Sequence, residues 1–239
     1  MTERRCVAIV QSSYIPWKGY FDLIGRADEF VLLDDAQFTK RDWRNRNLIK
    51  TPDGPLWLTI PVETKGRYRQ RIDETAISDP GWRDRHWKSL VHSYAAAQGF
   101  AEYRDTVEDL YRGTSDRMLS DVNRRLLKGI CALLGISTPL TRSSDYAVEG
   151  VKTDRLVNIC TAAGATVYLS GPRARAYLDE ERFQEVGIEV EYMDYSGYPE
   201  YPQPYPPFEH AVTILDLLFS TGADAPRYLK SRARDNAAV

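Results

Sequence analysis

Polar and aromatic side chains crowd the segment that follows the first apolar run of the chain. The run CVAIV leads directly into QSSYIPWKGY, where Gln11, Tyr14 and Lys18 carry hydrogen-bonding groups. A simple turn would need only Gly, Asn or Asp. The segment therefore predicts a loop that holds a ligand, with these three side chains orienting it.

A pair of acids ends the second apolar run, EFVLLDDAQF. Asp34 and Asp35 are adjacent, so one side chain points inward and the other outward. An acid at a strand end can act as a base, a metal ligand or a ribose-binding group, although Asp more commonly caps the next turn. We expect Asp35 to act in catalysis and Gln37, two residues further on, to bind substrate.

The segment KRDWRNRN, residues 40–47, interleaves basic residues with Trp and Asn. Guanidinium groups recognise phosphate or carboxylate through paired donors. Arg44, Asn45 and Arg46 are therefore expected to bind an anionic group, such as the phosphate of a nucleotide, a nucleotide-sugar or a phosphopantetheine arm. A solvated loop, or a small basic patch for nucleic acid, is the alternative interpretation.

The chain has three histidines, and two of them are candidates for a general base. His210 opens the expected helix HAVTILDLLF, directly after a Pro/Tyr-rich stretch. His86 is the second candidate. His86 and His92 lie six residues apart, on different faces of one helix, which is poor spacing for a shared metal ion. No metal site is predicted, and an ordinary helix-start histidine is the alternative for His210.

A second strand–turn–helix junction whose residues could bind a ligand is YLSGPRARAYL, residues 168–178. Ser170 ends an apolar run, Pro172 begins the expected helix, and Tyr177 lies one turn further on. Free amide groups at this helix start are suited to an anion, with two arginines nearby. Ser170 and Tyr177 are therefore predicted to bind substrate, while simple capping by Ser170 explains the pattern equally well.

The elements that position these residues alternate between strand and helix. CVAIV and EFVLLDDAQF, separated by a helical pattern over 19–28, form a βαβ unit and predict a mainly parallel α/β sheet. Ligands of such sheets lie beyond the carboxyl ends of the strands, so the two polar loops are expected to converge at one crevice. A hairpin is expected at PDG, residues 52–54, and helices over PRARAYLDEERFQEVG and HAVTILDLLFSTG. We expect one α/β domain, residues 1–239, with a helical insertion around 82–134.

Composition limits the classes of function. A net charge of -2 over 239 residues argues against a nucleic-acid-binding protein. Three cysteines without metal-like spacing suit a reducing compartment. The first residues are too quickly polar for a signal peptide, and no apolar run is long enough to span a membrane. We expect a cytoplasmic protein.

The long motifs together resemble the WbqC-like protein family. They are QSSYIPWKGYFDLI, DDAQFTKRDWRNRNLIK, WLTIPV, VYLSG with Tyr177, and HAVTILDLLFSTG, and they extend from residue 7 to about residue 222. The resemblance implies transfer chemistry on activated small molecules in surface-polysaccharide or specialised-metabolite biosynthesis. Amide formation from an acyl or aminoacyl thioester is one form that it implies.

The turn Pro16-Trp17-Lys18-Gly19-Tyr20 loosely resembles the Pro-x-x-Gly-His turn of the adenylyl-transferring nucleotidyltransferases. That resemblance implies a Rossmann-like fold in which Gly lets a helix start approach a ligand closely. Tyr20 stands where that turn has His and cannot supply the same charge to a triphosphate. Nucleotidyl transfer is therefore the alternative rather than the first hypothesis.

The first hypothesis is a transferase that moves an acyl or aminoacyl group from a carrier-bound thioester to an amine. The amine lies on a sugar, on a small metabolite or within the same acyl group, which would give a lactam. His210 or His86 would take the amine proton, donors from Gln11, Asn45 or Ser170 would stabilise the oxyanion, and two arginines would hold a phosphate. The expected partners are an acyl or peptidyl carrier protein, or an activated small-molecule donor, and the amine acceptor.

No separate cofactor is required by that hypothesis, because the donor is itself activated. Two alternatives stay open. A nucleotidyl- or adenylyl-transferring enzyme would need a divalent metal ion at Asp34 or Asp35. A non-catalytic module would bind a carrier protein or a nucleotide-sugar without turnover.

Overall fold

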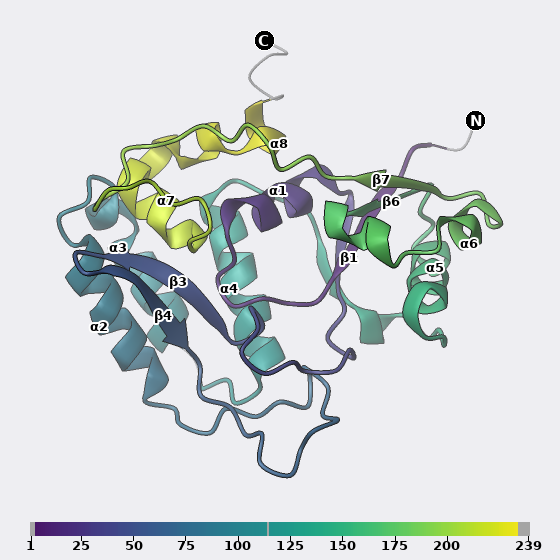
Figure 1. The fold of residues 1–239 in the computed structure, drawn as a ribbon, viewed down its shortest axis with the longest axis horizontal. Coiled ribbons are helices and arrows are strands. Elements are labelled where there is room, and N and C mark those ends of the chain that lie inside the picture. The colour runs from purple at the N-terminus through teal and green to yellow at the C-terminus, as the bar shows by residue number, and fades with distance from the viewer. Residues whose placement is uncertain (1–2, 114, 234–239) are drawn as a thin grey trace.

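A five-stranded parallel sheet forms the centre of the fold in the computed structural model, which describes residues 3–113 and 115–233 (Figure 1). The strand order is β5-β2-β1-β6-β7, and every neighbouring pair is parallel. The α/β class with a mainly parallel sheet is confirmed. The bounds of the five strands are β1 Cys6–Val10, β2 Glu29–Leu32, β5 Leu140–Arg142, β6 Val167–Ser170 and β7 Glu189–Tyr192.

The strands are short apolar runs because both faces of the sheet are covered. Alternate residues of β1 show this directly: Ala8 packs in a core shared with α1 (Lys18–Arg26), whereas Val7 and Ile9 pack in a second core with α5 (Lys152–Ala162). Figure 1 shows α5 and the short α6 on one side of the sheet and α1 on the other. The helices thereby leave the carboxyl ends of the strands free to form a site.

The connections make β1 and β6 a switch point of the sheet. From β1 the chain continues to β2 and β5 on one side, and from β6 it continues to β7 on the other. Loops that leave β1 and β6 therefore diverge and open a crevice between them, where α/β sheets of this kind bind ligands. This topology agrees with the loose Rossmann-like resemblance.

A hairpin and three helices lie between β2 and β5 in the chain. Strands β3 (Arg46–Thr51) and β4 (Gly54–Thr59) pair in antiparallel register around the PDG turn, so the predicted hairpin is confirmed. The expected helical segment 82–134 contains α2 Trp82–Tyr94, α3 Phe100–Arg112 and α4 Leu119–Leu133. Side chains of these helices share the core that covers the α1 side of the sheet.

Two predicted helices differ from the structure. The segment PRARAYLDEERFQEVG forms a 3₁₀ helix at Pro172–Ala176 and then α6 at Glu180–Gln184, rather than one helix. Its buried residues, Ala174 and Phe183, lie nine positions apart. In one α-helix that spacing is about two and a half turns and would place them on opposite faces. A break between the two pieces lets both residues face the core.

The last long helix begins four residues later than predicted. Helix α7 spans Ile214–Thr221, and the Thr213 hydroxyl accepts a hydrogen bond from the Leu215 amide as the N-cap. Thr is a favourable N-cap residue, so the helix begins after Thr213 and not at His210. Beyond the predicted end at Gly222 (φ +58°), a 3₁₀ segment, Gly222–Tyr228, leads to α8, Lys230–Ala233. No helix of the described residues is long and apolar enough to cross a membrane.

Candidate active site

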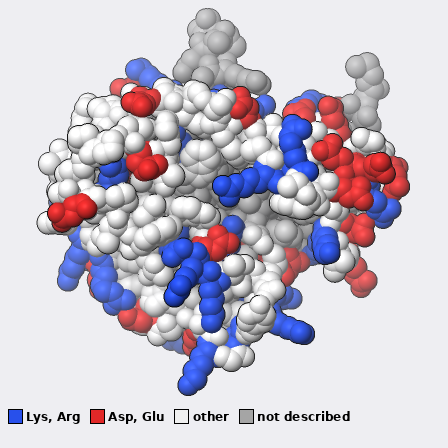
Figure 2. Space-filling model, viewed as in Figure 1, with Lys and Arg blue, Asp and Glu red and all other residues white. Residues whose placement is uncertain are grey.

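A cavity of about 850 Å³ opens at the switch point, beyond the carboxyl ends of β1 and β6. The residues that line it include four of the predicted site residues: Gln11, Asp35, Ser170 and Tyr177. They come from the loops after β1, β2 and β6, which are far apart in the sequence. The expected convergence of the two polar loops is thus present in the structure. Figure 2 shows a depression in this face of the molecule with Lys and Arg side chains around it.

Among the described residues that line the cavity, Asp35 supplies the one carboxylate, and two partners hold it in place. Oδ2 accepts a hydrogen bond from Arg155 Nη2 at 2.7 Å, and Oδ1 accepts one from the Ser143 hydroxyl at 2.8 Å. Arg155 also donates to the Val148 carbonyl. These contacts fix the orientation of a partly exposed carboxylate next to open space, which is what a catalytic carboxylate requires.

Aromatic rings form another wall of the cavity. Trp17 and Tyr195 pack edge to face with 5.2 Å between ring centroids, and Tyr20 lies beside them in the lining. The Tyr20 hydroxyl donates to the Gln11 carbonyl at 3.0 Å, which fixes the backbone of the loop after β1. The cavity lining therefore combines flat apolar surfaces with a carboxylate and its arginine.

Gly19 allows Trp17 to take this place. A Cβ at residue 19 would lie 2.3 Å from the Trp17 ring, well inside van der Waals contact. The indole thus folds back over the first turn of α1 and reaches the cavity. The Gly of the PWKGY turn is needed for a protein ring rather than for the direct approach of a ligand.

We expect Gly19→Ala to lower the free energy of unfolding by about 1–3 kcal/mol and to displace the Trp17 ring, because the added methyl group overlaps the indole. Urea denaturation and tryptophan emission measure the two effects. Gly81→Ala is the control, since a Cβ there would meet only the flexible ends of Arg85 and Asp79. Wild-type stability and emission in Gly19→Ala would contradict this account of the turn.

Lys18 points away from the cavity. Its ammonium lies 5.1 Å from the ring centroids of Tyr198 and Tyr201 and 5.5 Å from that of Phe208, and it donates to the Pro199 carbonyl at 3.2 Å. Burial lowers the pKa of Lys18 to about 8. The side chain thus holds the Pro/Tyr-rich segment against α1, and the structure does not place it among the ligand-contacting residues.

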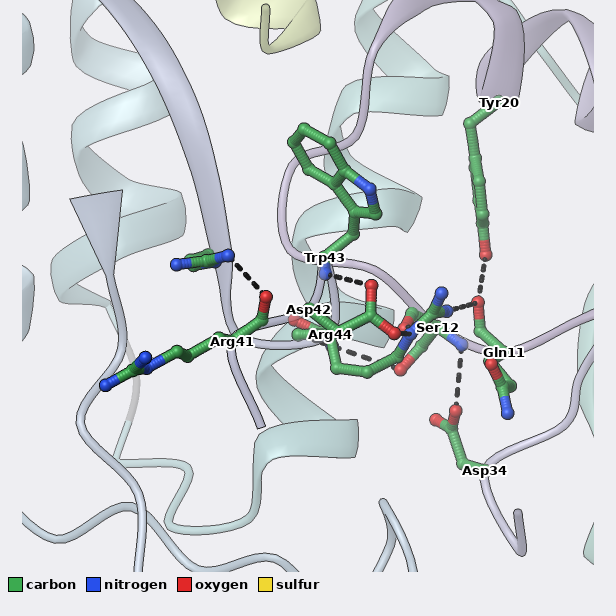
Figure 3. A network of polar contacts seen from close by, with 10 residues as sticks. Gln11, Ser12, Tyr20, Asp34, Arg41, Asp42, Trp43 and Arg44 are labelled. Carbon is green, nitrogen blue, oxygen red and sulfur yellow. Dashed lines mark hydrogen bonds and ion pairs between the residues drawn. The ribbon is translucent and has the colours of Figure 1, made fainter. Parts of the chain in front are cut away.

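The basic loop, residues 40–47, contacts the backbone of the loop after β1 rather than the cavity. Figure 3 shows the Arg44 side chain directed at the loop after β1, where Nη1 donates to the Gln11 and Ser12 carbonyls at 3.0 and 3.2 Å. Arg46 donates to the Arg41 carbonyl and stacks 4.1 Å from the centroid of the exposed Trp57 ring. Neither guanidinium lines the cavity. Arg44 positions Gln11, and Arg46 belongs to the hairpin surface.

The two predicted amide side chains of this region also lie outside the cavity. The buried Asn45 donates to the Ile60 carbonyl at 2.8 Å and so ties the basic loop to the end of β4. Gln37 donates to the Tyr68 carbonyl at 2.9 Å on the surface. Both therefore hold loops together rather than contact the cavity.

The structure brings neither candidate histidine to the cavity. His86 is buried, with Nδ1 2.7 Å from the Tyr14 hydroxyl and Nε2 3.2 Å from the Thr59 carbonyl, and burial lowers its pKa to about 4. The Tyr14 hydroxyl also contacts the Tyr111 hydroxyl at 2.7 Å, so Tyr14 and His86 belong to one internal network. His210 lies on the surface against Phe208.

Asp34, the inward member of the acid pair, carries a testable pH dependence. Its carboxylate accepts the Ser12 amide at 2.9 Å (Figure 3), and burial raises its pKa from 3.8 to about 6. Between these pH values the folded protein holds a proton that the unfolded chain has released. The contribution of Asp34 to stability is therefore full below about pH 4 and is lost as the pH rises to about 6.

We expect the stability of Asp34→Asn, relative to wild type, to rise by about 2–3 kcal/mol from pH 4 to pH 7, because Asn does not titrate. Urea denaturation of both proteins at several pH values measures the difference. Asp224→Asn, an exposed acid on the C-terminal 3₁₀ segment, should show no such rise. A stability difference independent of pH would contradict the assignment.

Some lining residues carried no recognisable sequence signal. Arg155 lies in the middle of an ordinary helical pattern, and its partner Asp35 is 120 positions away. Tyr195 lies in a segment without regular structure. Trp17 was also not predicted, although it lies in the aromatic loop after β1, from which Gln11, Tyr14 and Lys18 were chosen instead.

The fold and the cavity define a class: an α/β protein with a doubly wound parallel sheet and a ligand cavity at its switch point. The chain belongs to the WbqC-like protein family, whose model matches residues 11–228. A protein of Mycobacterium tuberculosis (strain ATCC 25618 / H37Rv) with the name Uncharacterized protein Rv1507c is 54% identical over 224 residues, which cover 94% of this chain and 97% of the relative. No solved structure gave a significant match.

Proposed function

We propose that the protein is a transferase that forms an amide by moving an acyl or aminoacyl group from a carrier-bound thioester to an amine. The observation that carries the proposal is the switch-point cavity, which is lined by Asp35, Gln11, Ser170 and Tyr177 together. Family membership is consistent with an enzyme of biosynthesis. The acceptor amine lies on a sugar, on a small metabolite or in the acyl group itself.

The reaction needs a proton acceptor near the amine. The amine nitrogen attacks the thioester carbonyl carbon, the carbon–sulfur bond breaks, and the thiol leaves with a proton. In this proposal Asp35 binds the amine and takes its proton, while Arg155 and Ser143 keep the carboxylate oriented. Asp35 thereby replaces the histidines as the preferred base, because neither histidine lines the cavity.

Donors for the developing oxyanion come from neighbouring strand ends. Gln11 follows β1 and Ser170 ends β6, and these strands are paired in the sheet. A side-chain amide and a hydroxyl are both suitable donors for such an oxygen. The backbone of Gln11 is fixed by Arg44 and Tyr20, which limits the movement of its side chain.

The dimensions and surface of the cavity suit a small activated molecule. A volume of about 850 Å³ lies within the usual range of ligand pockets, roughly 300–1,000 Å³. The rings of Trp17 and Tyr195 offer an apolar wall for an acyl chain or a pantetheine arm. The carboxylate lies in the same cavity, so both reactants have a place in it.

Nucleotidyl transfer is the second candidate because nucleotides bind at the switch points of such sheets. In that reaction a divalent metal ion at Asp35 would have to compete with Arg155, which is paired with this carboxylate at 2.7 Å.

Acyl transfer is tested by incubating the protein with aminoacyl- and acyl-loaded carrier protein and a panel of amino sugars and small amines. Thiol release is followed with a chromogenic reagent and amide formation by mass spectrometry. We expect both to occur together, without added nucleotide. Thiol release no faster than spontaneous hydrolysis, combined with a nucleotide-dependent product, would contradict acyl transfer and favour the second candidate.

A further inference from the structure

We propose that Lys152 and Arg173 form a subsite for a phosphate group of the substrate at the mouth of the switch-point cavity. The inference rests on the proposed function in one respect, that this cavity holds the substrate. It adds the chemical class of the group that is bound. The sequence predicted anion contacts in two places, the basic loop at residues 40–47 and the helix start after Ser170. The basic loop does not contribute to this subsite, whereas Arg173 belongs to the second place.

Both cations line the cavity and are exposed. Across residues 3–113 and 115–233, neither side chain makes an ion pair or a hydrogen bond with a protein group. The third cation of the lining, Arg155, is paired with Asp35, the single acid there. Two uncompensated positive charges thus line one cavity in a chain of net charge -2. That arrangement favours an anionic ligand group.

The two cations come from different elements and line the same cavity. Lys152 begins α5, and Arg173 lies in the 3₁₀ helix after β6. Lys152 has a φ of +51°, a left-handed conformation that is uncommon for Lys. Gly150 has a φ of +118°, and a Cβ there would lie 3.0 Å from the Arg155 amide nitrogen. The backbone before α5 is therefore tightly folded at the rim of the cavity.

The arginines of the basic loop are already used within the protein. Arg44 donates to two backbone carbonyls, and Arg46 donates to a third and stacks on Trp57. A phosphate bound there would have to displace these contacts. At Lys152 and Arg173 no protein group has to be displaced, so all of the charge-assisted hydrogen bonds would be gained on binding.

The aromatic part of the cavity lining indicates what the phosphate is attached to. Trp17 and Tyr195 would pack against an apolar or planar portion of the same molecule. Two sources have this chemistry: the phosphopantetheine arm of a carrier protein and the diphosphate of a nucleotide-linked sugar. The shared feature is a phosphate group at the mouth with an apolar or planar portion further in.

The test compares phosphorylated probes with their dephosphorylated partners by calorimetry. The pairs are 4′-phosphopantetheine with pantetheine and uridine diphosphate with uridine. We expect the phosphorylated member of one pair to bind at least about tenfold more tightly, since charge-assisted contacts to two cations are lost without it. The pair that shows the preference identifies the source of the phosphate.

Variants locate the subsite. The double variant Lys152→Ala/Arg173→Ala should lose the preference, whereas Arg175→Ala should keep it. Arg175 lies on the same 3₁₀ helix, is exposed and stacks 4.0 Å from the Tyr192 ring centroid, outside the cavity lining. Equal binding within both pairs, no measurable binding of any probe, or an unchanged preference in the double variant would overturn the proposal.

The readouts separate this inference from the proposed function. A phosphate preference that depends on Lys152 and Arg173, without amide formation from any thioester, would leave the subsite standing and remove acyl transfer. Amide formation with an unchanged donor KM in the double variant would support acyl transfer and remove the phosphate subsite.

Discussion

Asp35→Asn is expected to lower kcat for amide formation by about 10²–10⁴-fold, the usual contribution of a general base. Asn keeps the size of the side chain and can still accept the Ser143 hydroxyl, but it cannot take a proton from the amine. The KM for the donor should change little, because the donor is held elsewhere in the cavity. Steady-state rates of thiol release over a range of donor concentrations measure both constants.

His210→Ala is the matched control for that measurement. His210 lies on the surface outside the cavity lining, so the kcat of the His210→Ala variant should stay within about twofold of wild type. Circular dichroism verifies that both variants are folded. A fully active Asp35→Asn protein together with an inactive His210→Ala protein would restore the histidine as the base and reject the assignment to Asp35.

Asp216→Ala is expected to lower the free energy of unfolding by about 3 kcal/mol or more, because it leaves several buried hydrogen-bond donors without an acceptor. The carboxylate of this fully buried residue accepts hydrogen bonds from the Tyr94 hydroxyl, the Tyr201 hydroxyl and Gln203 Nε2, each at 2.7 Å. Burial raises the pKa of Asp216, while these hydrogen bonds oppose the rise. Urea denaturation measures the loss.

The same carboxylate joins α7 to α2 and to the Pro/Tyr-rich segment SGYPEYPQPYPPF, residues 196–208, which directly follows Tyr195 of the cavity wall. Asp216→Ala should therefore also weaken binding in the cavity, although Asp216 does not line it. Asp105→Ala, at a side chain that is 97% exposed, is the control and should unfold like wild type. Equal stability of Asp216→Ala and Asp105→Ala would show that the network is not needed.

The general position of the site could be predicted from the sequence by one physical rule. Polar residues directly after buried apolar runs must lie at the carboxyl edge of a parallel sheet, and this rule nominated Gln11, Asp35 and Ser170. Tyr177 followed from the strand–turn–helix pattern after β6. The hairpin and the helical segment were predictable because their turn and periodicity signals are local.

The direction of long side chains could not be predicted. Arg44 and His86 were nominated by residue type, but whether a guanidinium or an imidazole faces a cavity or the interior depends on tertiary packing. The Asp35–Arg155 pair joins residues 120 positions apart and leaves no periodic signal. The start of α7 was predicted at His210, four residues too early, because the favourable N-cap residue Thr213 was not used as the local signal for the helix start.

The central claim is that the substrate binds at the switch point between β1 and β6. A crystal structure of the protein with the pantetheine thioester of a small amino acid tests it most directly. We expect the thioester within hydrogen-bonding reach of Gln11 and Asp35, with the pantetheine arm against Trp17. A thioester bound on the hairpin surface, against Arg46 and Trp57, with the cavity between β1 and β6 unchanged, would contradict it.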